Sequence, residues 1–198
     1  MSDALHEYTD IIFPEMMSHP ALFIHPNPKK IAIFGDTDNR ILLEVLKHHS
    51  LVEIQHEHPT ISDPRIISST KKNQKDTFDV IINAANADNK MLAHFFKQLN
   101  TDGILIQASV SPFQIAQLKI AASQLQTIGF SDLQFLNFPQ PDFASGWRTI
   151  ILALKQGIFK RLREKVVFNK SFKTQYYNFD IHKAASALPE FMRHNDIF

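Results

Sequence analysis

A short turn between two apolar segments carries the residues best placed to bind a ligand. Gly35 and Asp36 follow the apolar run 31–34 and precede residues 41–46, whose apolar positions recur at helical spacing. The run predicts a buried strand and the spacing predicts a helix, with glycine permitting the sharp turn between them. Helix N-termini offer free backbone N–H groups and a positive dipole end to nucleotide-like ligands. The alternative is an ordinary strand–helix unit, because most glycines of a ligand-binding loop are absent.

Four histidines raise the question of a metal centre. His48 and His49 follow the predicted helix, and His56 and His58 share one face of the next predicted strand, where their imidazoles could converge. No carboxylate or cysteine stands out as a third ligand, and histidines at strand ends are usually solvated. We therefore predict no metal site.

Composition excludes several kinds of chemistry. The chain has no cysteine, which rules out disulfides and thiol catalysis and is typical of a reducing compartment. It contains no P-loop, no Gly-x-Ser-x-Gly motif and no paired-carboxylate motif. The net charge of +1 gives no field for nucleic acid, which is not an expected partner. The segment from Lys155 to Lys173 has seven basic residues against Glu164, and we interpret it as a solvated face, with an anionic partner as the alternative.

Length and hydropathy indicate one soluble domain. The 198 residues, 44% hydrophobic and 21% charged, suffice for a core. The start of the chain is polar, and no apolar run approaches the roughly 18 residues of a membrane span. We expect a cytoplasmic protein with no membrane contact.

The turn at Gly35 and Asp36 lies within a predicted pattern of alternating strands and helices. We expect a helix beginning after Pro14, a stop at residues 100–103, and an antiparallel pair joined by residues 139–146. The other expected strands are 51–56, 65–68, 78–83 and 104–108, the other helices are 89–99, 112–128 and 180–193, and residues 69–77 form a polar connection. The pattern predicts an α/β fold, a Rossmann-like doubly wound sheet, mostly parallel with an antiparallel hairpin at one edge. Residues 1–29 form a helix and a Pro-rich lead-in, and residues 30–198 form the domain.

Three stretches together resemble the spermidine synthase (polyamine aminopropyltransferase) family. Residues 13–30 lead through His-Pro-Asn-Pro-Lys-Lys into the first strand, and residues 102–113 contain Asp-Gly-Ile-Leu-Ile-Gln and Ser-Pro-Phe. The third stretch, residues 172–191, contains Tyr-Tyr-Asn, His and Ala-Leu-Pro at the family's spacing. The resemblance covers roughly residues 8–194. It implies a fold of the S-adenosylmethionine-dependent methyltransferase type without the family's N-terminal β-strand domain, whose loss leaves a surface that favours a homo-oligomer.

The resemblance also implies a ligand loop that has lost most of its glycines. The family reaction transfers an aminopropyl group from decarboxylated S-adenosylmethionine, a co-substrate rather than a cofactor, to putrescine. Gly35 and Asp38 of the loop are kept, and the loop's other positions carry side chains in the ligand's space. Glu57 is the candidate for the ribose hydroxyls, although it stands one residue away from the family's position.

The catalytic base of the family is missing from its aligned position. Aminopropyl transfer requires a carboxylate to take a proton from the attacking amine. The family places two aspartates after the strand 78–83, where this chain has Ala84 and Ala87, and Asp88, one residue further, is the remaining candidate. Where the family has two tyrosines that line the substrate site, this chain has Phe13 and Phe143. Three hypotheses stay open: an active aminopropyltransferase, a catalytically silent member that acts as a binding or scaffold protein, and a methyltransferase using intact S-adenosylmethionine.

Overall fold

A computed structural model describes residues 2–68, 77–160, 162 and 164–193. Its seven strands form one sheet in the order β3-β2-β1-β4-β5-β7-β6. The strands are β1 (Lys30–Phe34), β2 (Glu53–His56), β3 (Ile66–Ser68), β4 (Phe78–Asn83), β5 (Leu99–Ala108), β6 (Asp132–Pro139) and β7 (Trp147–Leu154). The neighbouring strands in the part β3-β2-β1-β4-β5 of the sheet are all parallel. Strand β7 runs antiparallel to both β5 and β6. The predicted mixed sheet with its edge hairpin is confirmed.

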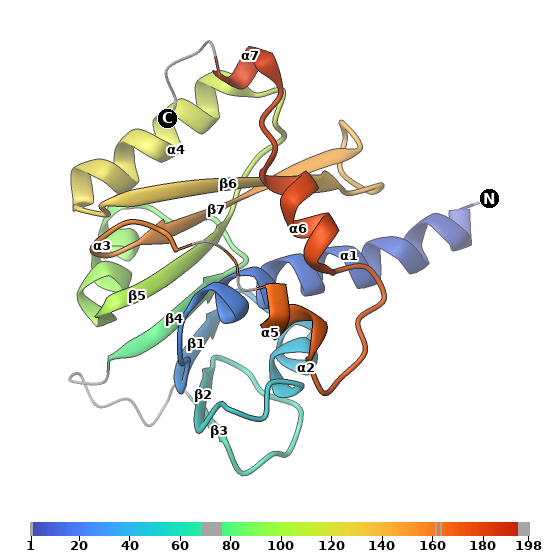
Figure 1. Ribbon diagram of the computed structural model, residues 1–198, viewed down its shortest axis with the longest axis vertical. Coiled ribbons are helices and arrows are strands. Elements are labelled where there is room, and N and C mark those ends of the chain that lie inside the picture. The colour runs from blue at the N-terminus through green and yellow to red at the C-terminus, as the bar shows by residue number, and fades with distance from the viewer. Residues whose placement is uncertain (1, 69–76, 161, 163, 194–198) are drawn as a thin grey trace.

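Helices cover both faces of the sheet (Figure 1), with α3 (Asn89–Gln98) and α4 (Ile115–Ile128) on one side. On the other side lie α1 (Ser2–Ile24), α2 (Arg40–Leu46) and α6 (Phe179–Ser186), while α5 (Glu164–Phe168) and α7 (Glu190–Arg193) are short C-terminal helices. Side chains of β1 alternate between the two cores: Ile31 and Ile33 pack with α1 and α2, whereas Ala32 and Phe34 pack with α3 and α4. None of the described helices is long and apolar enough to cross a membrane.

The first helix corrects a prediction. We expected Pro14 to mark its start, but α1 continues through both Pro14 and Pro20. A proline inside a helix removes one hydrogen bond and crowds the preceding turn. Burial offsets that cost here, because Met16, Met17 and Ala21 have no exposed surface and pack into the core. Ser18 also donates from Oγ to the Pro14 carbonyl oxygen at 2.8 Å.

Two further boundaries differ from expectation. The predicted stop at residues 100–103 lies within β5, whose pairing with β4 shifts register between Phe78 and Val80, so the segment is an irregularity in the strand rather than a turn before it. The predicted helix 180–193 is two helices, because Pro189 cannot continue α6 and instead precedes α7. The polar connection was assigned to residues 69–77, of which 69–76 lie outside the described residues, as do Arg161 and Arg163 of the basic segment.

Candidate functional site

A cavity of about 250 Å³ opens where β1 and β4 end. In a doubly wound sheet the order of the strands reverses at such a pair, and ligands bind beyond their carboxyl ends. We call it the strand-end cavity. Its lining is polar and comes from α1, the β1–α2 loop, the end of β4 and the β6–β7 connection: Asp10, Phe13, Pro14, Gly35, Asp36, Thr37, Asp38, Arg40, Ile41, Ala84, Gln140, Asp142 and Arg148.

Gly35 and Glu57 are brought together at the mouth of β1. Gly35 has a φ of 74°, and its N–H donates to Oε2 of Glu57 at 2.9 Å. Glu57 follows the last residue of β2, so the alternation of the strand no longer fixes its direction, and its carboxylate reaches the loop. The β1–α2 loop packs closely against the loop that follows β4, since a Cβ on Gly35 would lie 2.7 Å from the Cβ and the nitrogen of Ala85. The β1 and β4 loops therefore touch at this point.

Asp36 occupies the N-terminus of α2. Its carboxylate accepts from the N–H groups of Ile41 at 3.2 Å and Leu42 at 2.8 Å, and His56 Nε2 lies 3.2 Å from Oδ2. These backbone groups are the ones that a helix start would offer to an anionic ligand. The chain's own carboxylate, 6% exposed, already satisfies them. Sequence reasoning missed this capping role because Asp36 stands five residues before Ile41, too far for an ordinary N-cap.

Asp38 and Arg40 neutralise each other at the rim. Arg40 Nε lies 3.1 Å from Oδ2 of Asp38, and its Nη1 pairs with Asp10 on α1. The backbone N–H of Arg40 also donates to Asp38 Oδ1 at 3.3 Å. Asp38, the loop acid that the resemblance shows as kept, is thus paired with a guanidinium of the same loop.

At the end of β4 the cavity has a methyl group where the resemblance places a base. Ala84 lines the cavity, and its N–H donates to the Phe34 carbonyl oxygen at 2.9 Å. Asn83 and Gln107 hold the following turn, since both side-chain amides donate to the Ala85 carbonyl oxygen. Asp88 lies elsewhere: its Oδ1 accepts the Met91 N–H at 2.8 Å as the N-cap of α3. Its carboxylate is not among the groups lining the cavity.

The side chain of Arg148, on β7, places a second positive charge in the lining of the cavity. The Arg148 guanidinium lies 4.2 Å from the ring centroid of Phe13 and 5.2 Å from that of Phe143. Its Nε donates to the Ser109 carbonyl oxygen at 3.3 Å. Desolvation lowers the pKa of Arg148, opposed by the attraction of Asp142. A guanidinium over aromatic faces is a favourable cation–π arrangement, so the two phenylalanines already hold a cation.

Gln140 is the one lining residue with an unused buried polar atom among those described. Its side chain is 3% exposed, and its Nε2 donates to Asp142 Oδ1 at 2.6 Å, while Oε1 has no partner. Neither this residue nor Arg148 was predicted, because the β6–β7 pairing brings them to the cavity.

The four histidines that raised the question of a metal centre are not gathered into one group. His56 binds Asp36, and its Nδ1 accepts the backbone N–H of His58 at 3.1 Å. His48 instead contacts His19, with 2.9 Å between Nε2 and Nδ1. His49 is exposed.

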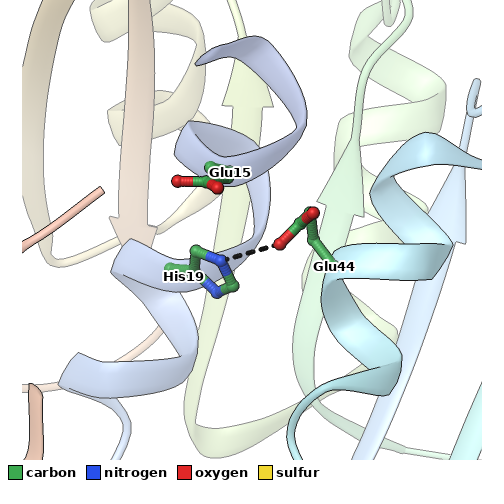
Figure 2. Close-up of side chains that lie close together, drawn as sticks. All are labelled: Glu15, His19 and Glu44. Carbon is green, nitrogen blue, oxygen red and sulfur yellow. Dashed lines mark hydrogen bonds and ion pairs between the residues drawn. The ribbon is translucent and has the colours of Figure 1, made fainter. Parts of the chain in front are cut away.

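A different cluster, Glu15, His19 and Glu44, is shown in Figure 2, with potential ligand atoms within 4.8 Å of one another. His19 Nε2 lies 3.1 Å from Glu44 Oε2, and Lys47 also binds Glu44. Glu15 accepts three backbone N–H groups from residues 175–177. Because these ligand atoms already have partners, a metal would have to displace existing bonds, and we assign the cluster to the fold.

Buried histidines make the fold sensitive to acid. Burial lowers the pKa of His48 to about 3 and that of His182 to about 4. In the unfolded chain both histidines titrate near pH 6.5, so below that pH the unfolded state binds more protons and gains stability relative to the folded state. We expect these two histidines together to lower the free energy of unfolding by about 2 kcal/mol between pH 6.5 and 5.5.

Urea titrations at a series of pH values measure this loss. A His182→Gln variant should lose about 1 kcal/mol of the pH-dependent change, whereas His49→Gln, at an exposed site, should keep all of it. A free energy of unfolding that stays constant from pH 6.5 to 5.5 would contradict the assignment of neutral, buried histidines.

Comparisons with known proteins agree with this architecture. The family model of the spermine/spermidine synthase domain matches residues 10–77. The polyamine aminopropyltransferase of Halorhodospira halophila is 32% identical over 96% of this chain and 81% of its own length. That of Methylococcus capsulatus is 34% identical over 92% of this chain and 75% of its own length. The first alignment runs over 227 positions, 29 more than the 198 residues here, so segments of that relative have no counterpart in this chain.

Two solved structures share the fold of this chain. The spermidine synthase of Thermotoga maritima superimposes with a TM-score of 0.80 at 25% identity, covering 93% of this chain and 73% of that one. A spermidine synthase in complex with the transition state analogue AdoDATO has the same TM-score and the same coverage at 24% identity. Fold and sequence identity together show that the chain belongs to the polyamine aminopropyltransferase (spermidine synthase) family.

Proposed function

We propose that this protein is a spermidine synthase-like, catalytically silent member of its family. The family reaction would transfer an aminopropyl group from decarboxylated S-adenosylmethionine to putrescine, and the strand-end cavity is the remnant of that site. The observation that carries the proposal is Ala84, whose methyl group lines the cavity where the attacking amine would need a carboxylate. The absence of cysteine supports a cytoplasmic location.

The size and contents of the cavity support the loss of activity. Small-molecule sites usually enclose about 300–1,000 Å³, whereas this cavity has about 250 Å³. Asp36 already occupies the start of α2, and the Arg148 guanidinium lies on the Phe13 ring. A protonated diamine would have to approach that fixed positive charge. These side chains of the protein therefore already occupy the positions and binding groups that a substrate would need.

Residual aminopropyl transfer is the second candidate. The carboxylates of Asp10, Asp38 and Asp142 line the cavity, and Gln140 Oε1 is a buried acceptor without a partner among the described residues. Together they would suit an ammonium group. In this alternative Asp142, rather than Asp88, is the carboxylate near the reacting amine, and Gly35, Asp38 and Glu57 would hold the co-substrate.

Calorimetric titration separates the two candidates. We expect no heat of binding when decarboxylated S-adenosylmethionine or methylthioadenosine is added to millimolar concentration, with or without putrescine. A relative with polyamine aminopropyltransferase activity serves as the positive control. Saturable binding that is lost in an Asp38→Asn variant would support the active alternative instead.

A further inference from the structure

A second cavity also has Arg148 in its lining. It encloses about 490 Å³ at the ends of β5 and β7, beside α3 and α4. We call it the β5 cavity. Its lining comprises Asn86, Ala87, Leu92, Gln107, Ala108, Ser109, Val110, Gln117, Ala121, Gln124, Leu125, Phe143 and Arg148. The volume falls within the usual range for small-molecule sites.

Among the described residues that line this cavity, Arg148 has the only charged side chain. It is half-buried, and no carboxylate of a described residue lies within 4.0 Å of its nitrogens. Asp142 attracts the guanidinium only at longer range. The guanidinium is fixed by Phe13 and by the Ser109 carbonyl oxygen, so little conformational freedom is left to lose on binding. A partly desolvated charge without a close counterion favours an anion.

The rest of the described lining is uncharged and suits a ligand that has both a polar group and an apolar part. The side-chain amides of Asn86, Gln117 and Gln124 make no hydrogen bond to another described residue and can donate to ligand oxygens. The partly exposed side chains of Ala87, Val110 and Ala121 supply apolar surface, and the nearly buried Leu92 and Leu125 pack behind it. One guanidinium together with this apolar surface favours a monoanion with a hydrocarbon tail. A phosphate dianion would leave one charge unpaired and would make no use of the apolar surface.

We propose that the β5 cavity binds a small aliphatic carboxylate, with the carboxylate on Arg148 and the hydrocarbon tail against the apolar surface of Ala87, Val110 and Ala121. The cavity shares Arg148 with the strand-end cavity, and Ala87 and Phe143 stand at positions that the resemblance assigns to the substrate site. It takes no lining from Gly35, Asp38 or Ala84, so carboxylate binding can be measured separately from aminopropyl transfer. In this proposal, Arg148 is the residue that makes the cavity select an anion over a neutral or cationic ligand.

A matched ligand series tests the charge requirement. The probes are 4-methylpentanoate, the neutral 4-methylpentanamide and the cationic 4-methylpentylamine, which share one hydrocarbon tail. Binding is followed by NMR through the side-chain amide signals of Asn86, Gln117 and Gln124, with the exposed Gln126 on α4 as an internal reference. We expect saturable shifts with the carboxylate, at least tenfold weaker binding of the amide, and no binding of the amine.

Variants of the two arginines complete the test. Arg148→Met should weaken carboxylate binding at least tenfold, and Arg148→Lys should retain part of it. Arg40→Met removes the same charge from the strand-end cavity alone and should leave carboxylate binding unchanged. Equal affinity for carboxylate and amide in the wild-type protein, or shifts that persist in Arg148→Met, would overturn the proposal. If Arg148→Met fails to fold, the wild-type ligand series and Arg148→Lys still decide it.

Discussion

Replacing Glu15 with alanine is expected to lower the free energy of unfolding by about 4 kcal/mol, the largest effect of any single substitution considered. Glu15 is 1% exposed and lies on α1. Its carboxylate accepts the backbone N–H groups of Gln175 at 2.7 Å, Tyr176 at 3.0 Å and Tyr177 at 2.6 Å. One side chain therefore joins the first helix to the C-terminal segment.

The size of the effect follows from what the substitution leaves behind. Hydrogen bonds to charged groups contribute about 1.5–3 kcal/mol each, and a buried N–H group without an acceptor costs about 1–3 kcal/mol. Three such bonds are lost together, partly offset because a buried charge is no longer desolvated. Tyr177, which is fully buried and contacts His182 through its hydroxyl, would lose its anchor.

Urea denaturation of the variant measures this loss. Glu15→Gln keeps one acceptor oxygen and should lose about half as much stability, while Glu164→Ala, at an exposed acidic position, should change the free energy of unfolding by less than about 0.5 kcal/mol. A loss below about 1 kcal/mol for Glu15→Ala would contradict the anchoring role.

Gly35→Ala should cost about 3 kcal/mol of unfolding free energy, the second largest effect. Two penalties combine at this position. A side chain at a φ of 74° is strained, and the new Cβ would lie 2.7 Å from the backbone nitrogen of Ala85. Because the clash involves backbone, the two loops must move apart, and the Gly35 N–H would be pulled from Glu57.

Gly146→Ala separates the two penalties. Gly146 has a φ of 70°, and a Cβ there would meet nothing within 4 Å. It should therefore cost only the conformational penalty, about 1 kcal/mol. Denaturation curves of both variants give the difference, which measures how tightly the β1 and β4 loops are packed. Equal losses for the two glycines would show that the loops can separate freely.

The core of the fold could be predicted from local patterns. Continuous apolar runs such as residues 78–83 identify strands that are buried on both faces, and the alternation of strands and helices identifies the doubly wound order. The course of α1 through Pro14 could not be predicted in this way, because its stability comes from burial against strands distant in the sequence.

The site was predictable only in part. The position of the β1 loop followed from strand, glycine and helix in succession, but the partners of its side chains did not. Asp36 reaches α2 because Asn39 adopts a left-handed conformation with a φ of 62°, which no sequence rule specified. Arg148 depends on the pairing of β6 with β7, although one signal was available: it shares a face of β7 with Ile150 and Leu152, where a charged residue is out of place.

We propose that the strand-end cavity no longer supports aminopropyl transfer. The most direct test is to incubate the purified protein with decarboxylated S-adenosylmethionine and putrescine and to quantify spermidine and methylthioadenosine by mass spectrometry. We predict no product above the level formed without protein. Production of both compounds in equal amounts, rising with protein concentration and abolished by Asp142→Asn, would contradict the claim.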